Sequence, residues 1–255
     1  MHLVDKLFNY TAEEINYISS KTNVMTEYHD IVIGLWIIAN HKPKHFFELG
    51  TGTGGWPVTM HNVLCMDDTR FTLSEDMTWG LSDFNYRGES YPKTIQELSQ
   101  LIHAKSKTPM KFEVLQNADL AKIQPYDTIR IDCEPSFEAF EMYINHCDKS
   151  SIVFIDDFKF NISLKRVAYT MELVSKNKLF PLWFGDQESA WTTSKEYRDN
   201  LLRIMYNQIG KMKLLKVNPR VFDQGRVGIT EWRYINTRGS SDLLFTTHKE
   251  NSNGK

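Results

Sequence analysis

Short apolar runs alternate with helix-like stretches along most of the chain, and this pattern predicts a sheet built from strands and connecting helices. The runs are rich in Phe, Ile, Leu and Val, as expected for strands buried on both faces. We expect strands at residues 45–48, 70–75, 110–116, 127–133, 152–156 and 179–184, with a final strand at 227–234. Strands that alternate with helices favour a doubly wound, mostly parallel α/β sheet.

Two helices are predicted before the first strand. Thr11 and Glu14 have the spacing of a capping box, in which each side chain bonds the other's backbone N–H, and this helix should extend to about Lys21. Apolar positions between Thr26 and Asn40 indicate a second, largely buried helix. Residues 1–42 are therefore expected to form a helical flank or lid, and packing against the sheet is the simpler role for Trp36.

One domain over residues 1–240 accounts for the pattern. Residues 185–212, which contain a helical stretch, are interpreted as an insertion before the final strand. Within it, Glu188 and Trp191 are candidates for an acceptor pocket or a dimer surface. Residues 241–255 are dominated by Ser, Asn, Lys and Gly and are expected to form a flexible tail.

Composition narrows the class of protein. The chain has 255 residues, of which 41% are hydrophobic, and its formal net charge of −2 offers no basic footprint for nucleic acid. Cys65, Cys133 and Cys147 form no CxxC pair, which argues against a disulfide framework or a zinc knuckle. No apolar run approaches the ~18 residues that suggest a membrane span. We therefore expect a cytoplasmic enzyme that acts on a small-molecule acceptor and could form a homodimer.

A glycine turn follows the first strand and is the most informative motif. Gly50, Gly52 and Gly54 have no Cβ and can adopt positive φ, so a cofactor can lie against the backbone. A helix should open near Trp56 with its first N–H groups directed at the ligand. The spacing Gly50-x-Gly52-x-x-Gly55 matches a dinucleotide fingerprint. A structural turn without a ligand is a third interpretation.

Read as Glu48-x-Gly50-x-Gly52-x-Gly54, the same turn resembles motif I of the class I S-adenosylmethionine-dependent methyltransferases. In that family the acid two residues before the first glycine lies near the cationic methionine end of the cofactor. A carboxylate attracts a sulfonium and an ammonium but repels a diphosphate, so Glu48 favours the sulfonium cofactor. The resemblance implies a seven-stranded Rossmann-like sheet and a cofactor site that includes Glu48, Gly50, Thr51, Gly52, Thr53 and Gly54.

Two further acids are candidates for the nucleoside part of that cofactor. Glu75 ends the second predicted strand, about 20 residues after the turn, where the family places the acid that accepts both ribose hydroxyls. Asp119 follows the third long strand and could accept from the exocyclic amine of adenine. A helix cap is at least as good a role for Asp119.

A second group of acids resembles the small-molecule O-methyltransferase branch of this family, which includes sugar-modifying enzymes. There, an Asp that ends the fourth strand and an acidic pair after the fifth bind a divalent cation, and Asp132, Asp156 and Asp157 match these positions. Such carboxylates repel each other unless they share a cation, and hard oxygen ligands favour Mg²⁺, Mn²⁺ or Ca²⁺ over zinc. Alternatively, one Asp binds the cofactor while Asp156 and Asp157 cap a loop or pair with Lys159.

The position of the general base departs from the family pattern. Related sugar-modifying enzymes often carry His, and catechol-type enzymes Lys, three residues after the strand-end Asp, where this chain has Pro135. A pyrrolidine ring cannot abstract a proton, so Glu134 is the candidate base, beside Asp132 and Asp156 as catalytic residues. Arg130 is unusual inside a central strand and is expected to pair with a carboxylate.

These motifs favour an S-adenosylmethionine-dependent O-methyltransferase that acts on a hydroxyl of a small molecule or sugar, assisted by Mg²⁺ or Mn²⁺. The literal dinucleotide spacing keeps a nicotinamide-dependent oxidoreductase as an alternative. An RNA methyltransferase is a third possibility, although no basic stripe is present. Pro135 keeps a non-catalytic binding protein under consideration.

Overall fold

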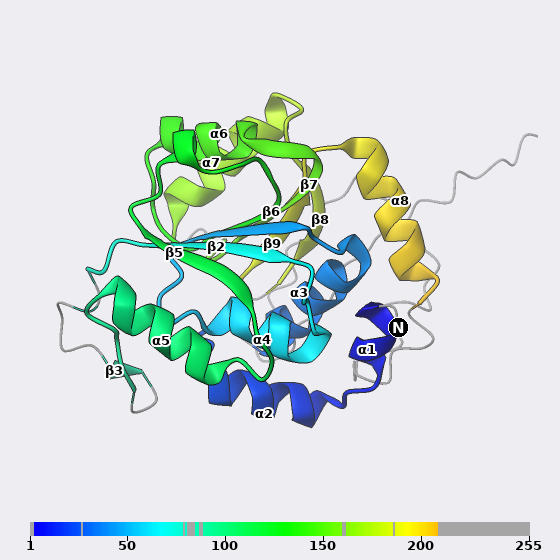
Figure 1. Ribbon diagram of the computed structural model, residues 1–255. Coiled ribbons are helices and arrows are strands. Elements are labelled where there is room, and N and C mark those ends of the chain that lie inside the picture. Colours follow the sequence, from blue (N-terminus) through cyan, green and yellow to red (C-terminus); the bar gives the residue numbers. More distant parts are fainter. Residues whose placement is uncertain are drawn as a thin grey trace, which may run out of the picture.

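The computed structural model describes residues 3–208 except 27, 79, 81–84, 87–88, 160–161 and 186. Within these residues, seven strands form one sheet in the order β5-β2-β1-β6-β7-β9-β8, and β3 and β4 form a separate two-stranded sheet (Figure 1). The strands are β1 (His45–Leu49), β2 (Arg70–Glu75), β3 (Asn85–Tyr86), β4 (Glu89–Ser90), β5 (Lys111–Gln116), β6 (Tyr126–Ile131), β7 (Cys147–Ile155), β8 (Phe180–Phe184) and β9 (Ser189–Thr192).

In the large sheet, the neighbouring strands β5, β2, β1, β6 and β7 are parallel, and β9 runs antiparallel to both β7 and β8. From β1 the chain moves outward to β2 and β5, and then returns to β6 on the other side of β1. The strand order therefore reverses between β1 and β6. In open α/β sheets, ligands bind at the carboxyl ends of the strands beside such a reversal.

Helices cover both faces of the sheet (Figure 1). They are α1 (Leu3–Phe8), α2 (Ala12–Thr22), α3 (Tyr28–His41), α4 (Gly55–Leu64), α5 (Ile95–Lys105), α6 (Phe137–Asn145), α7 (Leu164–Ser175) and α8 (Lys195–Tyr206), with a 3₁₀ turn at Leu120–Lys122. Helices α1 to α5 and α8 enclose one core, which includes Trp36, and α6 and α7 enclose the other. Trp36 is fully buried, as expected for packing against the sheet. Among the described residues, none of the helices combines the length and apolar character needed to span a membrane.

Alternation along the strands separates the two cores. Phe46 of β1 and Phe154 of β7 lie in the core with α3 and α4, whereas Phe47 and Ile129 lie in the core with α6 and α7. Because successive side chains point to opposite faces, even-numbered positions of β1, β6 and β7 share the α3 side. Polar residues at these positions are therefore brought to one face.

The N-terminal helices form as the sequence predicts. The carboxylate of Glu14 accepts from the Thr11 N–H at 2.7 Å, and the Thr11 hydroxyl accepts from the Glu14 N–H at 3.2 Å, which completes the capping box of α2. Such a cap contributes about 1 kcal/mol to helix stability. The second predicted helix corresponds to α3.

The segment assigned to an insertion differs from its prediction. Residues 189–192 form β9, a strand of the large sheet between β7 and β8. Its sequence, Ser-Ala-Trp-Thr, is too short and too polar to resemble a buried strand, which is why the apolar pattern missed it. Helix α8 follows, near the predicted helical stretch. The strand predicted at 227–234 and the tail at 241–255 lie outside the described residues.

Candidate functional site

The glycine turn joins β1 to α4 at the point where the strand order reverses. Gly50, Gly52 and Gly54 have φ values of 75°, 58° and 70°, which confirms the predicted positive φ. A Cβ on Gly50 would lie 2.1 Å from the backbone oxygen of Asp132, so this position needs both the conformation and the absence of a side chain. Gly54 caps α4 without a side-chain hydrogen bond. No side chain of the cap residue therefore occupies the first N–H groups of α4.

Glu48 lies beneath this turn and is completely buried. Its Oε1 accepts from Arg130 Nη1 at 3.1 Å, and its Oε2 accepts from the Thr51 hydroxyl. Burial raises the pKa of Glu48 to about 7, although Arg130 and Thr51 oppose the shift. Both carboxylate oxygens accept a hydrogen bond within the protein, and the place of Glu48 near the cofactor stays a prediction. Glu48 places negative charge under the turn.

Glu75 lies against the same turn from the end of β2. Its Oε2 accepts from the N–H of Gly52 at 2.6 Å, and burial raises the pKa of its carboxyl. The structure therefore brings together two of the predicted cofactor residues that are distant in sequence. Asp119 is exposed, precedes the 3₁₀ turn and pairs with Lys122 at 3.1 Å. This geometry corresponds to its predicted role in a turn.

Arg130 is the centre of the site, and all five N–H groups of its guanidinium donate to acceptors in the protein. Nε donates to Glu188 at 2.7 Å, Nη1 to Glu48 at 3.1 Å and Asp132 at 2.9 Å, and Nη2 to Thr26 at 3.1 Å and Asp156 at 2.8 Å. The predicted pairing of Arg130 with a carboxylate is confirmed, and it involves four of them.

The three predicted metal ligands converge. Asp132, Asp156 and Asp157 each offer a carboxylate oxygen, and these oxygens lie within 4.8 Å of one another. Two arginines are close by: Arg130 bonds Asp132 and Asp156, and Nη1 of Arg166 lies 3.9 Å from Asp132 and 3.8 Å from Asp157. The all-oxygen donor set fits Mg²⁺ or Mn²⁺, and the two guanidiniums are cations with which such an ion must compete.

Negative charge is unevenly distributed among these acids. Burial raises the pKa of Asp156 well above its ordinary value, whereas Arg130 and a hydrogen bond to Asp156 hold the pKa of Asp132 below its ordinary range. Glu188 is also fully buried, and burial raises its pKa to about 7. The acids here outnumber the arginines, and burial therefore favours proton uptake or another cation.

Glu134 lies at the outer edge of this group of acids. Its carboxylate is exposed and accepts from the hydroxyl of Ser163, the N-cap of α7, at 3.0 Å. Pro135 follows it in the loop between β6 and α6. Glu134 is thus held in place while remaining accessible, as a proton acceptor requires.

Sequence reasoning missed several residues of the site. Thr26 accepts from Arg130 and Arg166 donates to the backbone oxygen of Asp156, but each lies in a segment in which the sequence shows no motif. Glu188 and Trp191 are the predicted candidates for an acceptor pocket or a dimer surface. Instead, Glu188 bonds Arg130, and Trp191 is fully buried in the α6 and α7 core.

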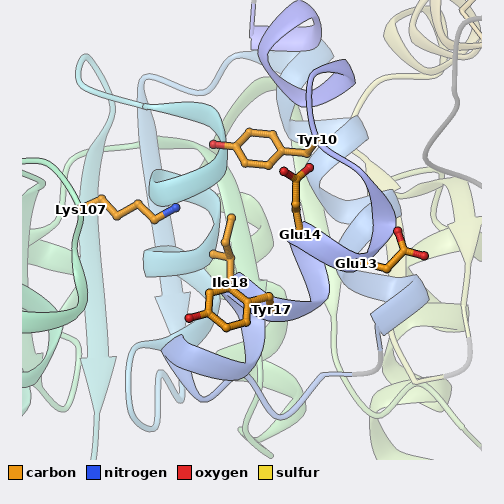
Figure 2. A pocket seen from close by; sticks show the side chains of 6 residues that line it. All are labelled: Tyr10, Glu13, Glu14, Tyr17, Ile18 and Lys107. Carbon is orange, nitrogen blue, oxygen red and sulfur yellow. The ribbon is translucent and has the colours of Figure 1, made fainter.

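A surface hollow of about 330 Å³ lies elsewhere on the molecule (Figure 2). Figure 2 shows side chains from α2 and the preceding turn on one side and Lys107 on the other. Its lining is Tyr10, Glu13, Glu14, Tyr17, Ile18 and Lys107. None of these residues belongs to the glycine turn or the acid cluster.

Comparison with known proteins gives only structural likenesses. No family model and no curated protein matches the chain. A candidate caffeoyl-CoA O-methyltransferase from Staphylococcus aureus has 15% identity and a TM-score of 0.48 over 73% of this chain and 93% of that one. An O-methyltransferase from Bacillus cereus in complex with SAH has 11% identity, 72% and 90% coverage and a TM-score of 0.47. A SAH-bound methyltransferase from Podospora anserina has 12% identity and a TM-score of 0.47 over 75% of this chain and 88% of that one.

Proposed function

We propose that this protein transfers a methyl group from S-adenosylmethionine to a hydroxyl of a small molecule. The observation that carries the proposal is the position of the acid cluster, directly against the glycine turn. The backbone oxygen of Asp132 packs on Gly50, and Glu48 lies beneath the same turn. A cofactor on this turn therefore lies next to buried carboxylates.

Electrostatics favour a cationic ligand over a diphosphate. Two guanidiniums, Arg130 and Arg166, face the carboxylates Glu48, Asp132, Asp156, Asp157 and Glu188. Negative charge in a low-dielectric site attracts a sulfonium and an ammonium and repels a diphosphate. In the alternative, a nicotinamide-dependent oxidoreductase, the diphosphate of the cofactor would have to lie beside this excess of carboxylates.

Sheet topology supports the same choice. The six-stranded dinucleotide fold has the order 3-2-1-4-5-6 in a parallel sheet. Here an antiparallel strand, β9, lies between β7 and β8. The sequence resemblance implies a mostly parallel sheet of seven strands, and the large sheet has seven.

The turn and its neighbours would hold the cofactor. Gly50, Gly52 and Gly54 give the ligand access to the backbone, and the residues between them, Thr51 and Thr53, are buried against the turn. Glu75 would accept hydroxyls of the ribose with the oxygen that does not bond Gly52. Asp119 is placed at the adenine end only by the sequence resemblance.

When bound, S-adenosylmethionine supplies an electrophilic methyl group, which leaves sulfur as the acceptor oxygen forms its O–C bond and gives up its proton. The carboxylate of Glu134 would accept that proton. Asp132, Asp156 and Asp157 would hold a divalent cation, Mg²⁺ or Mn²⁺. When bound, such an ion lowers the pKa of a hydroxyl that coordinates it.

A sugar is an acceptor of suitable chemistry, because two neighbouring hydroxyls can share one cation. The protein should be incubated with S-adenosylmethionine, Mn²⁺ and a panel of sugars and catechols, with detection of S-adenosylhomocysteine and the methylated product by mass spectrometry. The same panel with NAD⁺ is the control. Formation of S-adenosylhomocysteine with a methyl ether supports the proposal, whereas NAD⁺ reduction without methyl transfer would overturn it.

A further inference from the structure

We propose that Arg130 is a positioning residue. It fixes the glycine turn and the strand-end acids Asp132, Asp156 and Asp157, which we call the acceptor rim, as one unit. This inference rests on the proposed function and concerns a residue that neither motif contains. Arg130 lies in the centre of the sheet, between β1 and β7, where side chains are normally apolar. Its burial is therefore a feature that needs an explanation.

Stability alone does not supply that explanation. Taking charges out of water is costly, and a well-packed apolar group often stabilises a core as well as a buried ion pair does. Such groups persist where they specify one arrangement among several. Arg130 is 3% exposed, and the carbon of its guanidinium lies 5.6 Å from the centre of the Trp56 ring.

The geometry of the guanidinium shows what it specifies. Nη1 donates at once to Glu48, which supports the glycine turn, and to Asp132, which begins the acceptor rim. Nη2 adds Asp156 from the neighbouring strand. One planar group thus sets the relative positions of the donor end and the acceptor end of the site.

The same bonds select which oxygens remain for other ligands. Arg130 uses Oδ2 of Asp132 and Oδ1 of Asp156. The other oxygen of Asp132, Oδ1, lies 3.9 Å from Nη1 of Arg166, and Asp132, Asp156 and Asp157 each offer one oxygen within 4.8 Å of the others. Rotating either carboxylate would break a charge-assisted bond to Arg130, and such bonds are the stronger kind.

Lysine cannot reproduce this arrangement. Its ammonium has three N–H donors without the planar fork, so Arg130→Lys retains the charge but must lose at least two of the five bonds. We expect this variant to bind S-adenosylhomocysteine about tenfold more weakly by calorimetry. We expect a similar loss for Mn²⁺, followed through the electron paramagnetic resonance of the free ion.

A milder variant protects the test against misfolding. Thr26→Val removes only one of the five bonds, the one that Nη2 of Arg130 donates to the Thr26 hydroxyl, and should weaken the binding of both ligands about two- to threefold. Arg70→Lys is the matched control, since Arg70 is an exposed residue of β2 that pairs with Glu113, and both affinities should be unchanged. Circular dichroism should establish that each variant is folded at the temperature of the titration.

The outcomes separate this inference from the function on which it rests. Parallel loss of both affinities in folded Arg130→Lys and Thr26→Val supports a positioning role. Lower melting temperatures with wild-type affinities would show a purely structural role and overturn the inference, while leaving the proposed function intact. A wild-type protein that binds neither probe would overturn both.

Discussion

Glu48 and Arg130 are register partners on the neighbouring parallel strands β1 and β6, and Nη1 of Arg130 donates to Oε1 of Glu48 at 3.1 Å. The acid of the glycine turn is therefore tied to the strand that carries the acceptor rim. This bond explains how a buried carboxylate is tolerated in the middle of the sheet. It also places the charge of Glu48 under the turn instead of above it.

Gly50 offers a test of the turn. Gly50→Ala would put a Cβ 2.1 Å from the Asp132 oxygen at a φ of 75°, and we expect a loss of about 2–3 kcal/mol in the free energy of unfolding, measured in urea. Gly52→Ala is the control, because its Cβ would meet Tyr91 at an ordinary 3.4 Å and its cost should be nearer 1 kcal/mol. Equal stabilities of the two variants would contradict this description of the turn.

The raised pKa of Glu188 predicts a dependence of stability on pH. Its pKa moves from 4.5 to about 7, so the folded protein binds a proton more tightly than the unfolded chain. This contribution is fully present below pH 4.5 and is lost as the pH rises through about 7. Glu188→Gln removes that titration.

Urea unfolding at pH 5 and pH 8 measures this effect. The stability of Glu188→Gln relative to the wild type should improve between the two pH values by up to about 3 kcal/mol. Gln can still accept from Nε of Arg130, so the variant should fold. A relative stability that does not change with pH would show that Glu188 is ionised throughout.

Asp157 tests the divalent cation without disturbing Arg130. Its φ of 52° suits Asn, so Asp157→Asn should change stability by no more than about 0.5 kcal/mol. Loss of one anionic ligand should weaken Mn²⁺ binding about tenfold or more. Asp199→Asn, on the exposed surface of α8, is the control. Full methyl transfer in EDTA would remove the metal from the mechanism.

Glu75 tests the cofactor side. Glu75→Gln retains an acceptor for the Gly52 N–H but loses the charge that would bind ribose hydroxyls, so affinity for S-adenosylhomocysteine should fall about tenfold at nearly unchanged stability. Glu75→Ala also leaves that N–H without its acceptor and should cost a further 1–2 kcal/mol or so of folding free energy. Unchanged calorimetric affinity in both variants would exclude Glu75 from the ribose site.

Sequence alone located the parts whose signals are local. The glycine turn, the capping box and the strand-end acids follow from turn chemistry and short-range periodicity, and the structure places Asp132, Asp156 and Asp157 together as expected from parallel strand ends. Arg130 was recognisable as an anomaly in an apolar strand. Its need for a carboxylate partner could therefore be predicted.

The identity of most of those partners could not be predicted. Glu188 and Thr26 reach Arg130 from segments 58 and 104 residues away, and no local pattern encodes such contacts. Glu188 lies just before β9, and this strand has only four residues, two of them polar. The bond between Glu48 and Arg130 could not be predicted either, because the two residues become neighbours only when β1 and β6 pair.

Calorimetric titration of the wild-type protein with S-adenosylhomocysteine, and separately with NADH, tests the central claim most directly. We expect binding of S-adenosylhomocysteine that is lost in Gly50→Ala variants that remain folded, and no comparable heat with NADH. Tight binding of NADH without binding of S-adenosylhomocysteine would contradict the proposal that the glycine turn and its acid cluster receive a methyl donor.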